Sequence, residues 1–240
     1  MSRVDEPGLH HPRPSVRAAG RTVIGAIGIV AMLIGLLFVP AGRWNWIEAW
    51  LFVVGYAAFL GLCVLWGLFK DPGQLEERSR IAGNTKLWDR VILTIYTVMQ
   101  LATFIVVGLD AGRFRWSAVP VALKVIAWVG LLAAGSLIFS AVATNTYLAQ
   151  TARIQDDRGQ VVVTRGPYRF VRHPMYLGNI LLFACAPLAL GSLWAQIPAL
   201  TVGALFIIRT RAEDAMLLQE LEGYAAYAKS VRYRIVPGIW

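Results

Sequence analysis

The chain has 240 residues, of which 57% are apolar and 15% charged, and its formal net charge is +9. Its mean hydropathy of +0.57 lies far above that of an ordinary soluble domain. The apolar runs are long and continuous, which excludes the short alternating segments of a transmembrane β-barrel. The sequence therefore predicts an all-α, polytopic integral membrane protein with no room for a separate soluble catalytic domain.

The apolar runs and their breaks predict about six transmembrane helices. Residues 1–20 are rich in Pro, His and Arg, so we expect a disordered cytoplasmic tail. Residues 21–142 form a four-helix transmembrane region, with spans at about 21–39, 47–69, 91–109 and 119–141. Residues 176–208 are apolar but interrupted by Pro and Gly, and are too few for two full spans of about 20 residues plus a loop. We expect a tight hairpin there, whose second arm continues as a cytoplasmic C-terminal helix.

The distribution of Lys and Arg predicts how the chain crosses the membrane. Residues 1–20, 70–90 and 143–175 and the C-terminal tail are rich in these residues, whereas the connections between them are poor. The positive-inside rule then places both termini in the cytoplasm. Because the basic residues are spread over several loops and form no single stripe, we expect contact with anionic lipid and no nucleic acid partner.

Residues 166–178 are the strongest candidate for a functional site. They contain the sole histidine outside the N-terminal tail, with two prolines, two glycines and several Arg and Tyr residues. Ionisable groups this close to a membrane-length segment are costly, which indicates a site at the membrane face. The expected hairpin returns to the same face near residue 209, so residues 166–178 and 209–214 can meet.

Common motifs for other chemistries are absent. The chain has no Gly-x-Gly-x-x-Gly or Walker motif, no nucleophile elbow and no His-Glu-x-x-His. Cys63 and Cys185 lie in apolar runs, so neither a disulfide framework nor a metal site is indicated. The charged 70–90 loop is interpreted either as a solvated surface helix or as a lid over a cofactor. What remains is a pocket of Arg, His, Tyr and acidic residues, which suits a ligand with a carboxylate, an ammonium and an aromatic ring.

The residues of this pocket carry a family resemblance. The motifs are Gly166-Pro167-Tyr168, Arg172-His173-Pro174-x-Tyr176-x-Gly178 and, further on, Glu213-Asp214. Together they resemble the C-terminal signature of the isoprenylcysteine carboxyl methyltransferase family of integral membrane methyltransferases, in its bacterial form. Related signatures occur in phospholipid N-methyltransferases. The family usually has Glu-Glu where this chain has Glu213-Asp214.

The resemblance implies a site for S-adenosyl-L-methionine that opens to the cytoplasm, within a catalytic region covering residues 143–240. It implies a lipophilic or lipidated acceptor, most simply a carboxylate, that enters from the membrane lipid. Arg209 or Arg211 would hold the acceptor carboxylate, with anchoring at a helix end as the alternative. The implied cofactor-binding residues are Gly166, Pro167, Tyr168, Arg172, His173, Pro174, Tyr176, Gly178, Glu213 and Asp214.

Two other functions are weighed against methyl transfer. The first is a sterol-reductase-like oxidoreductase that uses NADPH, although no additional basic patch for a 2′-phosphate is evident. The second is a transporter or structural membrane protein, for which inverted repeats are expected and none is visible.

The charge distribution predicts the outcome of cysteine-accessibility labelling in intact cells. Single cysteines at Ser117 and Lys229 should react from opposite sides of the membrane, with Lys229 on the cytoplasmic side. Labelling of both from the same side would contradict the predicted topology.

Overall fold

The computed structural model describes residues 16–78 and 85–240. Within these ranges every regular element is a helix, as the sequence predicts. The α-helices are α1 (Val16–Ala41), α2 (Ile47–Lys70), α3 (Pro72–Arg78), α4 (Leu87–Val107), α5 (Val121–Thr144), α6 (Pro174–Leu190), α7 (Gln196–Glu220) and α8 (Tyr224–Ser230). A π-helical segment, Gly108–Phe114, extends α4, and two 3-10 turns are formed by Asp156–Arg158 and Gly166–Arg169.

The start of α1 corrects one boundary. Residues 1–15 of the predicted tail lie outside the described residues, but α1 begins at Val16 and therefore includes residues 16–20, which were expected to be disordered. Ala18 and Ala19 are strong helix formers directly before the first apolar run, so the helix extends back through them.

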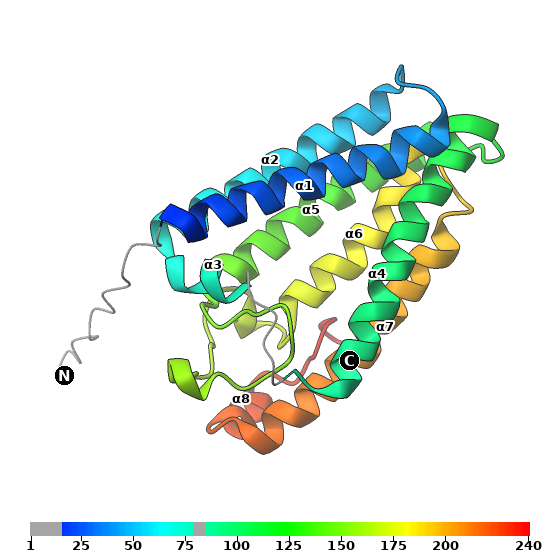
Figure 1. Cartoon of the computed structure of the whole chain (residues 1–240). Helices are drawn as coiled ribbons and strands as arrows, with labels where there is room; N and C mark the ends of the chain where they lie inside the picture. Colours follow the sequence, from blue (N-terminus) through cyan, green and yellow to red (C-terminus); the bar gives the residue numbers. More distant parts are fainter. Residues whose placement is uncertain (1–15, 79–84) are drawn as a thin grey trace.

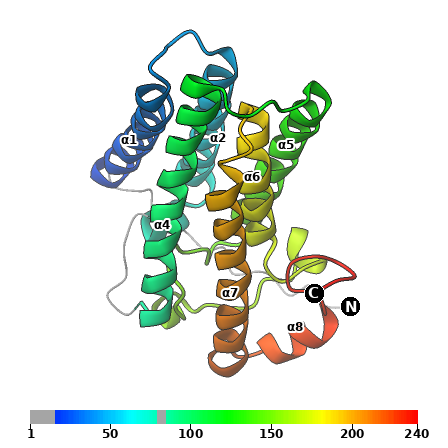
Figure 2. The same cartoon turned by 90° about the vertical axis from the view of Figure 1, so that its right-hand side faces the viewer.

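The long helices alternate in direction and form one bundle (Figures 1 and 2). The short connections at 42–46, 115–120 and 191–195 lie together at one end. The opposite end carries α3, residues 145–173, α8 and the C-terminus, and is called the site end below. The expected hairpin is formed by α6 and α7, which lie side by side and connect through Gly191 with a φ of 89°.

Four helical segments among the described residues are long and apolar enough to cross a membrane. They are Ala19–Ala41, Ile47–Lys70, Leu87–Phe114 and Val121–Thr144, which match the four spans predicted for residues 21–142. The helix α6 is apolar but has 17 residues, and the second half of α7 carries charged side chains. The hairpin therefore remains a proposed fifth and sixth crossing.

Helices α5 and α6 pack with almost no side chain between their backbones. A Cβ atom on Gly178 would lie 2.6 Å from Cγ1 of Ile138 and 3.2 Å from the carbonyl oxygen of Ala134. One on Gly130 would lie 2.4 Å from Sγ of Cys185. Small residues allow such close approach of helices, which is a main source of stability in a bilayer. This contact fixes the beginning of α6, where the candidate site starts.

The buried carboxylate of Asp110 fixes the other end of the hairpin. It accepts hydrogen bonds from the hydroxyls of Ser117 and Ser192, each at 2.6 Å. The backbone N–H groups of Ser117 and Trp194 donate to it at 2.9 and 3.3 Å. The turn between α6 and α7 is thereby tied to the end of the π-helical segment.

The close contact at Gly178 predicts a stability effect. Gly178→Ala should destabilise the protein by about 1 kcal/mol in net terms, since overpacking costs about 1–3 kcal/mol and the gain in helix propensity offsets part of it. Gly61→Ala in α2 is the matched control, because a Cβ there meets no atom within 4 Å. Thermal unfolding in detergent measures both, and equal stability of the two variants would contradict the packing argument.

Candidate functional site

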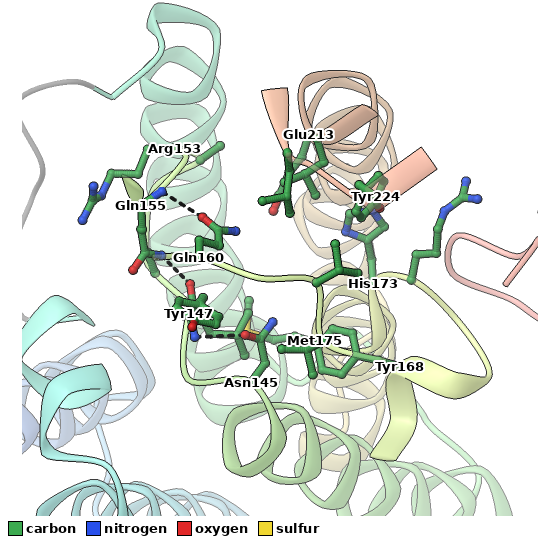
Figure 3. Close-up of a pocket in the computed structure, with 18 of the residues that line it drawn as sticks. Asn145, Tyr147, Arg153, Gln155, Gln160, Tyr168, His173, Met175, Glu213 and Tyr224 are labelled. Atoms are coloured by element: carbon green, nitrogen blue, oxygen red, sulfur yellow. Dashed lines mark hydrogen bonds between the residues drawn. The ribbon is translucent and has the colours of Figure 1, made fainter. Parts of the chain in front are cut away.

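A narrow polar cavity of about 90 Å³ lies at the site end. Figure 3 shows its two sides: His173, Glu213 and Tyr224 face the segment that carries Gln155 and Gln160. Six of the predicted site residues line the cavity, namely Tyr168, Arg172, His173, Tyr176, Arg209 and Glu213. The structure thus brings together residues 168–176 and 209–213, as the hairpin argument predicts.

The carboxylate of Asp214, which is 1% exposed, is the most heavily bonded group beside the cavity. Arg172 Nη2 and Arg234 Nε donate to its Oδ2 at 2.9 and 2.8 Å. The hydroxyl of Tyr224 donates to Oδ1 at 2.8 Å, and Nε2 of His173 lies 3.4 Å from the same atom. This one carboxylate therefore connects α7, the start of α6, α8 and the C-terminal tail.

These partners determine the ionisation of Asp214. Burial alone would raise the pKa of its carboxyl, but hydrogen bonds from His173, Tyr224 and Arg234 outweigh burial and hold the pKa well below its usual range. Burial and the facing carboxylate raise the pKa of Tyr224 in turn. Asp214 is thus ionised, and Tyr224 is a neutral donor, at neutral pH.

The guanidinium of Arg172 makes several hydrogen bonds within the protein. Besides Asp214, its Nη1 donates to the carbonyl oxygens of Ala228 and Val231, each at 3.2 Å. The backbone N–H groups of Arg172 and His173 donate to the carbonyls of Tyr233 and Arg234, at 3.0 and 2.8 Å. Arg172 therefore holds the C-terminal tail against the cavity.

Glu213 is the acidic side chain that lines the cavity. It accepts a short hydrogen bond from the hydroxyl of Tyr176, whose ring stacks on His173 with 5.5 Å between the ring centroids. Because a carboxylate accepts up to about four hydrogen bonds, Glu213 keeps most of its capacity for a ligand. An acid, an imidazole and an aromatic ring are thus presented together.

Arg209 lies where the cavity meets the membrane-spanning part of the bundle. Its Nε donates to Oδ1 of Asp89 at 2.8 Å, and its Nη2 donates to the carbonyl of Gln150 at 2.9 Å. Asp89, at the start of α4, also accepts a hydrogen bond of 2.7 Å from the backbone N–H of Ala152. The guanidinium lies over the ring of Tyr176, 5.3 Å from its centroid. This buried pair fixes α7, α4 and the 145–163 segment relative to one another.

A second, much larger cavity of about 1500 Å³ extends between the long helices, and it is called the groove below. Apolar residues of α1, α2, α4 and α5 line most of it, such as Phe59 and Leu131. Several lining side chains are open to the side of the bundle, for example Leu62 (48% exposed) and Leu132 (74% exposed). The groove and the polar cavity share the wall residues Ala149, Thr151, Met175 and Arg209.

The outer wall of the polar cavity consists of residues 145–163, whose regular structure is a single 3-10 turn. The backbone N–H of Gln155 donates to Oε1 of Gln160 at 2.8 Å, and its side-chain amide donates to the carbonyl of Tyr147 (Figure 3). Its Oε1 accepts a hydrogen bond of 2.7 Å from Nη1 of Arg158. Arg153 bonds to Glu77 of α3 at 2.7 and 3.0 Å. A wall of this kind adjusts without unfolding a long helix.

The described part of the 70–90 loop, which includes the short helix α3, makes contacts with the elements around the site. Besides Glu77, the amide of Gln74 donates to the carbonyl of Val142 at 2.8 Å. Lys86 forms an ion pair with Glu220 at 2.9 Å. Residues 79–84 lie outside the described residues. The contacts support the interpretation of this loop as a cover over the site.

The other predicted site residues do not line the polar cavity, and their role in cofactor binding stays a prediction. Gly166 has a φ of 59°, and a Cβ there would lie 2.6 Å from Oγ1 of Thr144, so it serves a turn packed on α5. Gly178 contacts α5, as described above, and Arg211 is exposed on another face of α7. Pro167 and Pro174 begin the 3-10 turn and α6, respectively. Asp214 holds the surrounding elements and does not face the cavity.

Other residues of the site were missed by the motif reading. They are Asn145, Tyr147, Arg153, Gln155 and Gln160, which lie around the polar cavity. The polar character of 145–160 was the available signal. Asp89 and Tyr224 stand in Trp88-Asp89-Arg90 and Gly223-Tyr224, which also resemble the family pattern, but the sequence assigned them no role.

Comparisons with known proteins agree with the motif-based resemblance. Residues 122–222 match the model of the phospholipid methyltransferase family. The chain is also 29% identical over 136 residues to the cobalt-zinc-cadmium resistance protein CzcN of Cupriavidus metallidurans. That alignment covers 54% of this chain and 57% of the relative, so the two proteins correspond over little more than half their lengths.

The fold and the family match together define a class: a helical protein with four candidate membrane spans and a region at residues 122–222 that is similar to phospholipid methyltransferases. The resemblance to the integral membrane methyltransferases is confirmed over that range. The range includes both 168–176 and 209–214, and it begins inside α5, ahead of the predicted boundary at 143. Asp89 and Arg234, which hold the site from outside, lie beyond it.

The bonds of Asp214 predict a large loss of stability in Asp214→Asn. Breaking a buried ion pair leaves Arg172 uncompensated, which typically costs about 3–5 kcal/mol. Asp157→Asn is the control, since Asp157 also pairs with an arginine but is 64% exposed at its side chain, and it should have almost no effect.

The same carboxylate predicts a pH dependence. The folded pKa of Asp214 lies below its unfolded value of about 3.9, so its stabilising contribution is present above that pH and is lost as the pH falls toward the folded pKa. Between pH 6 and pH 3 the wild-type protein should therefore lose more stability than Asp214→Asn. Equal losses in a denaturation series would show that Asp214 is not the stabilising group.

Proposed function

We propose that this protein is a membrane methyltransferase that transfers a methyl group from S-adenosyl-L-methionine to a lipophilic acceptor, most simply a carboxylate. The observation that carries the proposal is the shared wall between the polar cavity and the apolar groove. Methyl transfer from a polar donor to a lipid-soluble acceptor requires two such sites that meet. Arg209 and Met175 lie at the meeting point.

The chemistry of the polar cavity fits the proposed cofactor. S-adenosyl-L-methionine carries an ammonium, a carboxylate, ribose hydroxyls and a purine. Glu213 has free acceptor capacity for the ammonium or the hydroxyls, and charge-assisted bonds of this kind are the strong ones. His173 and Tyr168 lie beside it, and Asn145, Gln155 and Gln160 offer further donors and acceptors on the opposite wall (Figure 3). We infer that Glu213, His173 and Tyr168 hold the cofactor.

The size of the polar cavity sets a condition on binding. Ligand sites usually measure about 300–1,000 Å³, and this cavity measures about 90 Å³. Because the 145–163 wall is largely irregular, we expect it to move outward when the cofactor binds. The described contacts of Arg153 with Glu77 and Asp157 are the ones that such a movement would strain.

The proposed acceptor needs little chemical activation. A carboxylate is ionised at neutral pH, so it can attack the methyl group carried by the sulfonium without a general base. Catalysis then consists mainly of aligning the two reactants away from water. Arg209 is suited to this task, since Asp89 and Gln150 fix its orientation while its Nη1 makes no hydrogen bond to the described residues. That atom can donate to an acceptor oxygen.

The match to the phospholipid methyltransferase family supports a second candidate acceptor, a lipid amine. Such an acceptor must lose a proton, and Glu213 is the carboxylate available in the polar cavity. We propose the carboxylate first, because the groove presents arginines at its site end and an arginine favours an anionic head group. In either case the polar cavity would open to the cytoplasm of a bacterial cell.

Cofactor binding tests the proposal. Isothermal titration of the purified protein should show binding of S-adenosyl-L-methionine and none of NADPH. Glu213→Gln should raise the dissociation constant about ten- to a hundred-fold, since a charged hydrogen bond is worth about 1.5–3 kcal/mol.

The matched control for this titration is Glu220→Gln, on the same helix but paired with Lys86 at the surface. Its dissociation constant should equal that of the wild-type protein. Binding of NADPH in place of the methyl donor would favour the oxidoreductase, and equal effects of the two variants would remove Glu213 from the site.

A further inference from the structure

Arg78 differs from the other arginines buried near the site. Arg153, Arg172 and Arg209 each face a carboxylate, on Glu77, Asp214 and Asp89 respectively. The Nη1 atom of Arg78 is buried and has no hydrogen-bond partner among the described residues. The Nε atom of Arg172 also makes no hydrogen bond there, but it lies 2.9 Å from a carboxylate oxygen of Asp214. A buried polar atom without a partner is rare in proteins and requires an explanation.

The surroundings of Arg78 do not neutralise its charge. Burial lowers the pKa of its guanidinium, and the two nearby groups that oppose this change are Cys63 and Tyr168. A thiol and a phenol with ordinary pKa values near 8.5 and 10 are both neutral at pH 7, whereas an arginine remains charged. Neither neighbour therefore carries a negative charge that balances the buried Nη1 end of the guanidinium at pH 7, which is energetically costly.

Arg78 lies in the wall of the groove at the last residue of α3, at the site end. From there the groove continues between the long helices, past Tyr56, Phe59 and Phe104. It therefore has one charged end and a long apolar body that is open to the side. This is the shape and polarity of an amphiphile with a hydrocarbon tail and a small anionic head.

We infer that the groove binds an anionic amphiphile whose head group pairs with Arg78. The head group is a carboxylate or a phosphate, and the tail lies among the apolar side chains of α2, α4 and α5. Arg209 differs in role, because Asp89 already balances its charge. Arg78 supplies the net positive charge that selects an anion, while Arg209 orients the oxygen nearest the polar cavity.

The inference rests on the proposed function at one point only, where the bound amphiphile is taken to be the methyl acceptor. The proximity of Arg78 to Tyr168 supports that assignment, since Tyr168 lines the polar cavity. An anion held at Arg78 would lie next to the wall that separates it from the donor. Binding itself requires no methyl donor, so the two proposals can fail separately.

A fluorescent fatty acid tests the anion site. The purified full-length protein in a neutral detergent is titrated with cis-parinaric acid and with its methyl ester, which differ in the charge of the head group. The wild-type protein should bind the acid about ten-fold more tightly than the ester. Arg78→Gln should remove this preference and leave binding of the ester unchanged, and Arg78→Lys should retain most of it.

Arg113→Gln is the control, because it removes the same charge from the opposite end of the bundle, where Arg113 is exposed. It should keep the wild-type preference. Equal affinity of the wild-type protein for acid and ester overturns the inference, and so does a preference that persists in Arg78→Gln. If Arg78→Gln binds neither probe, the wild-type preference and its retention in Arg78→Lys decide the matter.

Competition identifies the source of the anion. Displacement of the bound acid by palmitate alone indicates a single-chain carboxylate, as the methyl acceptor requires. Displacement by dioleoyl phosphatidylglycerol alone indicates a resident phospholipid head group at the same arginine. Displacement by neither contradicts an anion site for amphiphiles. A protein that keeps the acid preference but does not bind S-adenosyl-L-methionine loses the methyltransferase proposal alone.

Discussion

The candidate site depends on one buried carboxylate, that of Asp214. Four side chains converge on it from the start of α6, from α8 and from the C-terminal tail. Ion pairs and hydrogen bonds therefore join these elements to α7 at this point. An ionised carboxylate can be buried when several donors bond to it. A buried cationic partner without this carboxylate would be energetically costly. The geometry of the polar cavity thus depends on the hydrogen bonds and ion pairs that this one carboxylate makes.

A second buried pair, Asp89 with Arg209, links this assembly to the membrane-spanning helices. It lies at the wall between the polar cavity and the groove, and it also bonds to the backbone of residues 150–152. The cofactor side and the lipid side of the proposed site therefore share one rigid contact. In the proposed arrangement, Arg78 adds a positive charge to the groove wall with which an anionic head group can pair.

The sequence predicted the parts of this arrangement that depend on pattern. Continuous apolar runs predicted the helices, and a short interrupted run predicted the hairpin that brings His173 near Glu213. Which carboxylate faces the cavity could not be predicted, since Glu213 and Asp214 are adjacent and a helix turns them about 100° apart. The roles of Asp89 and Arg78 depend on tertiary contacts over long separations, which no local pattern encodes. Gly178 illustrates the same limit: a glycine in a motif serves helix packing here.

The most direct test of the central claim is transfer of radiolabel from S-adenosyl-L-[methyl-³H]methionine into the lipid extract of membranes that contain this protein. A donor cavity that meets a groove for lipophilic carboxylates predicts label in the organic phase that alkali releases as methanol, since it is a methyl ester. The same membranes with Glu213→Gln should show little label. Absence of label from the organic phase of wild-type membranes, or label that alkali does not release, would contradict the account.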